Sequence, residues 1–226
     1  MKVVAKPMAE ISLPAAQLAI ATAAAVILLL VSLHVLSPEF DPSWRMVSEY
    51  ANGQYSWVLS LMFIAWAVSS WALVFAIWSQ VRTTAGKIGL VFLIVAGIGE
   101  AMASVFDINH PLHDLASAFG ILGLPIAALL ISVSLGRTQA WSPAKKALLR
   151  TANLTWISVL LLIATFAILI FTFLQAGGNM TGEVPTELPP GVIGLVGWTN
   201  RLLIVVYCIW VANVAWQALK LRRQES

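Results

Sequence analysis

Six apolar segments, each long enough to cross a lipid bilayer, occupy most of this 226-residue chain. A membrane-spanning helix needs about 20 predominantly apolar residues. The segments that meet this length lie at about 15–36, 57–79, 88–106, 111–136, 152–174 and 193–219. Hydrophobic residues make up 60% of the chain and charged residues only 10%, which excludes an ordinary soluble domain. We therefore expect an all-α fold, with residues 1–226 forming one integral membrane domain, a bundle of six transmembrane helices.

The basic side chains are divided unequally between the two sides of these segments. One side holds Lys2, Lys6, Arg82, Lys87, Arg137, Lys145, Lys146, Arg150, Lys220, Arg222 and Arg223. The other side holds only Arg45 and Arg201. Because Lys and Arg accumulate in cytoplasmic loops, we expect both termini in the cytoplasm of a multi-pass protein of the cell (plasma or inner) membrane. This topology also explains the net charge of +3 without a nucleic-acid partner.

Most of the remaining ionisable side chains lie on the outward side. They are Glu39, Asp41, Glu49, Asp107, Asp114, Glu183, Glu187 and the three histidines, His34, His110 and His113. The sequence therefore predicts an outward-facing polar layer, and any chemistry of the protein is expected there.

Two charged residues, Glu100 and Arg201, lie inside apolar segments. A charged side chain at the centre of a membrane helix costs about 2.5–3.5 kcal/mol on insertion scales, so such residues usually pair or line a cavity. Three interpretations are open: a structural ion pair that joins the third and sixth helices, a functional site that contains both residues, or a protonated and inert Glu100. Arg201 is also within reach of Asp107 or Glu49, and Glu49 is within reach of Arg45.

The short link DINHPLHD between the third and fourth segments is the densest group of polar residues. Asp107, His110 and His113, together with His34 at a similar depth, form a chemically plausible zinc ligand set. A proton relay or general acid–base role is a second interpretation. The third is structural: the histidines lie at the membrane interface, Asp107 ends the third helix, and Asn109 or His110 begins the fourth.

Three patches resemble the "domain of unknown function 998" family of six-helix prokaryotic membrane proteins. They are SEYANGQYSWVLSLMF, GIGEAMASVFDINHPLHDLAS and GLVGWTNRLLIVVYCIW. The residues at matching positions are Ser48, Glu49, Phe106, Asp107, His110, His113, Gly197 and Arg201. The chain departs from the pattern where it lacks a proline between Phe106 and Asp107 and where Pro111 replaces a usual glycine. The resemblance implies the six-helix fold but no activity.

Three functional hypotheses follow, and whether the protein is an enzyme is left open. In the first, a polar pocket binds a small molecule, ion or lipid from the bilayer, and its lining is Glu49, Glu100, Asp107, His110, His113 and Arg201. In the second, a metal-dependent hydrolase acts on a lipid-like substrate through zinc held by His34, Asp107, His110 and His113. In the third, a non-catalytic partner protein uses the polar layer only to hold its helices together.

Overall fold

The computed structural model describes residues 11–179 and 185–225, and all regular structure in these ranges is helical. Lys2, Lys6 and Glu183 lie outside the described residues. The six long helices are α1 Leu13–Leu36, α2 Ser56–Ile77, α3 Thr84–Val105, α4 His113–Leu135, α5 Lys145–Gln175 and α6 Val196–Glu225. Two short 3₁₀ helices, η1 Val47–Asn52 and η2 Ser142–Ala144, lie in connecting segments. The predicted all-α fold class is confirmed.

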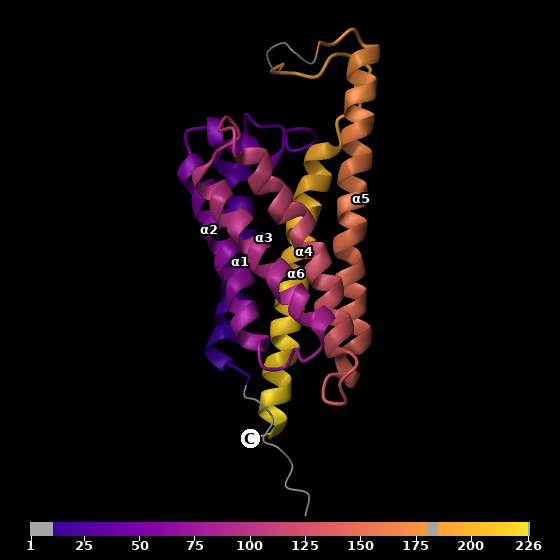
Figure 1. The fold of residues 1–226 in the computed structure, drawn as a ribbon. Coiled ribbons are helices and arrows are strands. Elements are labelled where there is room, and N and C mark those ends of the chain that lie inside the picture. Colours follow the sequence, from indigo (N-terminus) through magenta and orange to yellow (C-terminus); the bar gives the residue numbers. More distant parts are fainter. Residues whose placement is uncertain (1–10, 180–184, 226) are drawn as a thin grey trace, which may run out of the picture.

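Each of the six long helices is long and apolar enough to span a bilayer, so the chain is a multi-pass membrane protein. The helices run alternately up and down, and the start of α1 lies at the same end of the bundle as the end of α6 (Figure 1). The connections between α2 and α3 and between α4 and α5 lie at this same end, and together with the starts of α3 and α5 they carry Arg82, Lys87, Arg137, Lys145, Lys146 and Arg150. The polar layer lies at the opposite end, where α1, α3 and α5 end.

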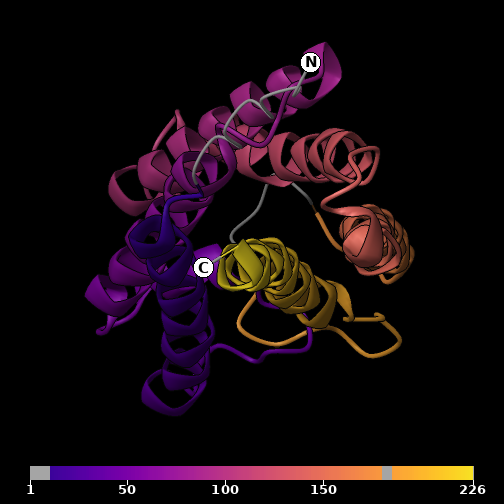
Figure 2. The ribbon, with the colours of Figure 1, turned by 90° about the horizontal axis from the view of Figure 1, so that it is seen from below.

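Helix α6 lies in the middle of the bundle and α5 at its edge (Figure 2). Helix α6 packs against α1, α2, α4, α5 and η1, while α5 contacts mainly α4 and α6. As a result, 61% of the apolar stretch of α6 is buried but only 17% of that of α5. Most of α5 therefore has lipid rather than protein as its neighbour.

Several helix boundaries differ from the predicted ones. Helix α4 begins at His113 instead of 111, because the backbone N–H groups of His110 and His113 close two successive turns onto the carbonyls of Asp107 and His110. Helix α3 begins at Thr84 instead of 88, because the Thr83 hydroxyl caps it.

Helices α5 and α6 also extend beyond their predicted ends on the basic side of the bundle. Helix α5 begins at Lys145 instead of 152, since the sequence KKALLR is made of strong helix formers. Helix α6 begins at Val196 instead of 193 and runs to Glu225 instead of 219. Both extensions at the basic end place charged residues on helices that leave the apolar layer.

Helices α3 and α4 approach each other closely at Gly99. A Cβ atom at this position would lie 2.5 Å from the carbonyl oxygen of Ala116 and 2.7 Å from the Cβ of Phe119. Small residues allow membrane helices to pack backbone against backbone in this way. Gly120, on the facing helix, has more room, because its nearest neighbour would be the Cγ of Glu100 at 3.9 Å.

We predict that Gly99→Ala destabilises the bundle and that Gly120→Ala does not. The added methyl group at Gly99 would push α3 away from the α4 backbone, at a cost of about 1–3 kcal/mol. At Gly120 the methyl group fits and alanine is the better helix former. Thermal unfolding of the two purified variants measures the difference; equal melting temperatures would contradict the tight α3–α4 contact.

Candidate functional site

The Arg201 guanidinium, on α6, is buried in a cage of neutral acceptors. Its Nε donates to His34 Nε2 at 2.8 Å, and its Nη2 donates to the Tyr50 hydroxyl at 3.0 Å. Its Nη1 donates to the carbonyl oxygens of Arg45 at 2.7 Å and Gly197 at 3.0 Å. The guanidinium carbon also lies 5.5 Å from the centre of the Tyr50 ring. Every nitrogen of the side chain is therefore satisfied, and the contacts join α1, η1 and α6.

The Arg201 contact fixes the tautomer of His34. A guanidinium can only donate, so His34 Nε2 must accept and Nδ1 must carry the hydrogen. The Nδ1 atom lies 2.7 Å from the carbonyl oxygen of Leu30, which it can then donate to. The ring also stacks on Trp198. With both nitrogens used in this way, His34 is not free to ligate a metal.

The segment that joins α1 to α2, residues 37–55, is fastened to the same face of α6. The Gly197 amide donates to the Ser43 carbonyl at 2.9 Å, and the Val47 amide donates to Asn200 Oδ1 at 2.9 Å. A Cβ at Gly197 would lie 2.5 Å from the Pro42 carbonyl oxygen, so glycine is needed for this approach. We call this segment the α1–α2 loop. Its position is set by α6 residues one turn apart.

Two acidic residues stabilise the α1–α2 loop from within. Glu49 accepts a hydrogen bond from Arg45 Nη1 at 2.6 Å and a second from the Met46 amide at 2.7 Å. Of the two arginines within reach of Glu49, its ion-pair partner is therefore Arg45. Hydrogen bonds from Ser43 lower the pKa of Asp41 below its usual value, and the positive charge of Arg201 lowers this pKa further. Arg201 thus acts on the loop through its charge as well as its contacts.

Of the three interpretations of Glu100 and Arg201, the ion pair between them is wrong. Neither side chain has an ion-pair partner among the described residues, and Arg201 points to the loop rather than to α3. Glu100 is 3% exposed. One of its oxygens, Oε2, accepts from the Ser70 hydroxyl at 2.8 Å. The other, Oε1, has no hydrogen-bond partner within the part of the chain that the structure describes.

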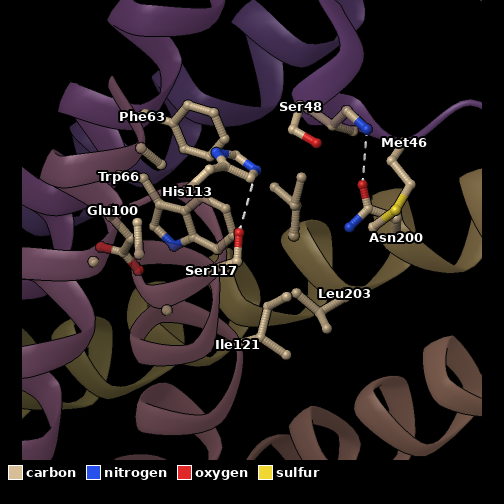
Figure 3. A pocket seen from close by; sticks show the side chains of 16 residues that line it. Met46, Ser48, Phe63, Trp66, Glu100, His113, Ser117, Ile121, Asn200 and Leu203 are labelled. Atoms are coloured by element: carbon tan, nitrogen blue, oxygen red, sulfur yellow. Dashed lines mark hydrogen bonds between the residues drawn. The ribbon is translucent and has the colours of Figure 1, made fainter. Parts of the chain in front are cut away.

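Glu100 lines a cavity of about 70 Å³, here called the inner chamber. Its walls come from η1 with the residue before it, α2, α3, α4 and α6, and Figure 3 shows their side chains converging on it. The lining comprises Met46, Val47, Ser48, Phe63, Trp66, Gly99, Glu100, Ala103, His113, Ala116, Ser117, Gly120, Ile121, Asn200, Leu203 and Ile204. Of the six residues expected to line a polar pocket, the inner chamber brings together only Glu100 and His113.

His113 lines the inner chamber, and each of its ring nitrogens lies within hydrogen-bond distance of a neighbouring group. Its Nδ1 lies 3.0 Å from the Phe106 carbonyl oxygen and must carry a hydrogen to bond it. Its Nε2 lies 3.3 Å from the Ser117 hydroxyl, which donates to it when the ring is neutral (Figure 3). The ring is thus oriented by the end of α3.

The remaining expected ligands lie apart from the inner chamber. Asp107 accepts from the Asn109 amide at 2.9 Å, and the His110 ring stacks on Phe106 with centroids 4.4 Å apart. Both are exposed and shape the α3–α4 turn. Neither Asp107 nor Asn109 caps a helix, since α3 ends at Val105 and the residue preceding α4 is Leu112.

The predicted zinc ligand set does not form. Within residues 11–179 and 185–225, no three His, Cys, Asp or Glu side chains are grouped so that they could hold a metal ion. His34 is used by Arg201, His113 by Phe106 and Ser117, and His110 and Asp107 by the α3–α4 turn. The short link of the sequence is a hydrogen-bonded turn, so its histidines point in different directions.

Two larger cavities adjoin the inner chamber. The loop cavity, about 470 Å³, is lined by Trp44, Arg45, Met46, Glu49, Asn52, Ile108, Asn109, Phe166, Leu169, Ile170, Phe173, Asn179, Pro185, Leu188 and Val196. The α4–α5 cleft, about 360 Å³, is lined by Met46, Asp114, Ser117, Ala118, Ile121, Leu122, Val159, Leu162, Ile163 and Phe166. Met46 lines all three spaces, Phe166 lines the two larger ones, and Ser117 and Ile121 line both the cleft and the inner chamber.

The family described as "Protein of unknown function (DUF998)" matches residues 19–217. The chain belongs to this family. Membership of DUF998 confirms the resemblance seen in the three sequence patches. No curated protein and no solved structure matches the chain. The comparisons therefore assign the chain to a family but assign it no activity.

The structure explains several residues that carry the DUF998 resemblance. Gly197 admits the α1–α2 loop, Arg201 holds it, and Glu49 fixes its backbone at Met46. Residues that sequence reasoning missed are the polar and aromatic members of the inner chamber, above all Trp66, with Ser70 beside Glu100. A serine or tryptophan in an apolar segment does not by itself indicate a site, because its neighbours on other helices are known only once the helices are packed.

We predict that Arg201→Lys destabilises the protein far more than Arg45→Lys. A lysine ammonium cannot reach four acceptors on three elements, and hydrogen bonds to charged groups contribute about 1.5–3 kcal/mol each. A lysine at position 45 can keep the ion pair with Glu49 four residues along the chain and loses only the bond from Nη2 to the Pro185 carbonyl oxygen. Thermal unfolding and limited proteolysis of the α1–α2 loop compare the two variants. Similar losses in both would contradict the role of the Arg201 cage.

Proposed function

We propose that this protein binds an amphiphilic, lipid-like molecule from the bilayer in the α4–α5 cleft. The observation that carries the proposal is that three cavities of different polarity adjoin one another around Met46. The two larger cavities, at about 360 and 470 Å³, fall within the range of about 300–1,000 Å³ usual for small-molecule sites.

The α4–α5 cleft suits a hydrocarbon chain. Most of its wall is apolar, including Ala118 and Leu122 on α4 and Val159 and Ile163 on α5, and its polar side chains are Asp114 and Ser117 near the start of α4. Three of these four apolar side chains are exposed on the bundle surface, and Val159 is buried. Helix α5 is the span least covered by protein, so a chain can enter the cleft sideways from the lipid past the exposed apolar side chains of Leu122 and Ile163.

The loop cavity suits a polar group at the end of the same molecule. It combines the Arg45–Glu49 pair with the side chains of Asn52 and Asn109, which bond to each other at 2.8 Å. Aromatic and aliphatic residues of α5 form the other wall. Apolar walls that lead to a few polar groups are the usual composition of a ligand site.

Binding agrees with the geometry better than metal-dependent hydrolysis does. The four residues expected to hold zinc are engaged in separate hydrogen bonds, whereas Glu100 and His113 share a cavity beside the cleft. Arg201 belongs to the support of the site, because each of its three side-chain nitrogens donates to a protein acceptor.

A photoreactive alcohol tests the binding proposal. Hexadecan-1-ol carrying a mid-chain diazirine is added to the protein in lipid nanodiscs, and the sample is irradiated. The labelled peptides are then mapped by mass spectrometry. We expect labelling in 118–122 and 159–166, and Ala118→Trp should reduce it about tenfold by filling the cleft. Ala164→Trp, on an exposed part of α5 outside the cleft, is the matched control. Labelling spread evenly over all lipid-facing helices would refute the site.

We also propose that both termini face the cytoplasm and that the polar layer faces outward in the cell membrane. The support is the distribution of Lys and Arg over the connections. The buried Cys208 is the only native cysteine, so an introduced thiol can be labelled selectively. In intact cells a membrane-impermeant maleimide should modify Glu39→Cys and not Gln139→Cys, which should react only after permeabilisation. The reverse pattern would invert the topology.

A further inference from the structure

Two buried polar atoms of the inner chamber lack a partner in the described ranges of the chain. They are Glu100 Oε1 and Trp66 Nε1, and both residues line the chamber. Glu100 is 3% exposed and Trp66 is 6% exposed. Leaving a buried donor or acceptor unsatisfied costs about 1–3 kcal/mol. Here two such atoms belong to residues that line one cavity. Figure 3 shows the two side chains on the same side of the chamber.

The chemistry of these two atoms restricts what can complete them. The indole N–H of Trp66 can only donate, so its partner must offer an acceptor. Glu100 Oε1 accepts when the carboxyl is ionised and can donate when it is protonated, while Oε2 is already bonded to Ser70. In either state, the partner that serves both atoms must be able to accept and, for the ionised form, also to donate.

Common lipid head groups differ in how well they meet this requirement. An ammonium group has donors only and leaves the Trp66 N–H without an acceptor. A phosphate or carboxylate has acceptors but brings negative charge against Glu100 in a cavity that contains no Lys or Arg. A hydroxyl group accepts through its oxygen and donates through its hydrogen. It is also small enough for a cavity of about 70 Å³.

We propose that the inner chamber binds the hydroxyl group of an uncharged long-chain alcohol whose chain lies in the α4–α5 cleft. This inference rests on the proposed function and identifies the ligand class of the same site. The hydroxyl oxygen accepts from Trp66 Nε1 and completes the hydrogen bonding of Glu100 Oε1. The loop cavity then receives any further polar part of the molecule.

The chamber and the cleft are close enough for one molecule to occupy both. Ser117 and Ile121 line the two spaces, so these side chains form the boundary between them. Ser117 also carries the hydroxyl that bonds to His113 Nε2, which provides a polar step on the way from the cleft to Glu100. The aliphatic Ile121 supports the first carbons of the chain.

Competition between two matched probes tests this inference. Dodecan-1-ol and 1-methoxydodecane compete with the diazirine alcohol for labelling of the protein in nanodiscs, with concentrations expressed as mole fractions in the bilayer. The ether keeps an oxygen acceptor for the Trp66 N–H but has no donor for an ionised Glu100 Oε1, and in either state of Glu100 its methyl group must also fit the chamber of about 70 Å³. We expect the alcohol to compete about five- to tenfold more strongly, the size expected for one or two net hydrogen bonds.

Two variants locate the selectivity in the inner chamber. Trp66→Phe removes the N–H and keeps most of the ring, and Glu100→Leu removes the carboxyl group; each should reduce the preference for the alcohol to less than about twofold. Trp156→Phe is the matched control, because the Trp156 N–H is also buried without a partner but lies outside all three spaces. Thermal unfolding confirms that each variant used is folded.

The outcomes separate this inference from the proposed function. If alcohol and ether compete equally while labelling stays confined to the cleft, the hydroxyl inference is overturned. The inner chamber then holds water, and the proposed ligand site in the cleft still stands. A preference for the alcohol that survives both Trp66→Phe and Glu100→Leu also overturns it. Failure of the diazirine alcohol to label the cleft overturns the proposed function and this inference together.

Discussion

The Arg201 guanidinium is the interaction on which the polar end of this protein depends. It carries a charge into a membrane helix and is neutralised by no carboxylate in contact with it among the described residues; four neutral acceptors on α1, the α1–α2 loop and α6 receive its hydrogens instead. In a water-poor region such a cage holds its elements together, because any acceptor that leaves exposes an unsatisfied donor. The loop that it holds supplies one wall of the inner chamber and one wall of the loop cavity. The fold and the site therefore share one support.

The six helices could be predicted from the sequence because membrane spans are recorded in length and apolarity alone. The boundaries could not, since Thr83 and the α3–α4 turn set where α3 and α4 begin through hydrogen bonds that composition does not show. The cost of burying Glu100 and Arg201 was also visible in the sequence, and both are buried. Their partners were not visible: depth along a helix is easily counted, whereas the direction of a side chain around the axis depends on how the helices pack.

The same limit explains why the polar layer divides into separate parts. Residues at one depth, such as His34 and His113, suggested one shared site, yet one faces Arg201 and the other faces Ser117. The residues that complete the inner chamber, Trp66 among them, look like ordinary members of an apolar helix. Their significance comes from a cavity between helices that are distant in sequence. A site of this kind is a property of packing, and the clue in the sequence was only that Glu100 had to be near something polar.

Met46 borders the inner chamber, the loop cavity and the α4–α5 cleft. Its backbone amide is held by Glu49, but its side chain is unbranched and has three rotatable bonds. One shared part of the boundary between the three spaces is therefore a side chain that can change rotamer without any displacement of a helix, while Ser117, Ile121 and Phe166 on α4 and α5 form other shared parts. Side-chain rotation occurs within picoseconds to nanoseconds when the side chain is exposed, whereas helix displacement takes microseconds or longer. Rotation of the half-buried Met46 side chain can therefore change how these spaces connect without the slower displacement of a helix.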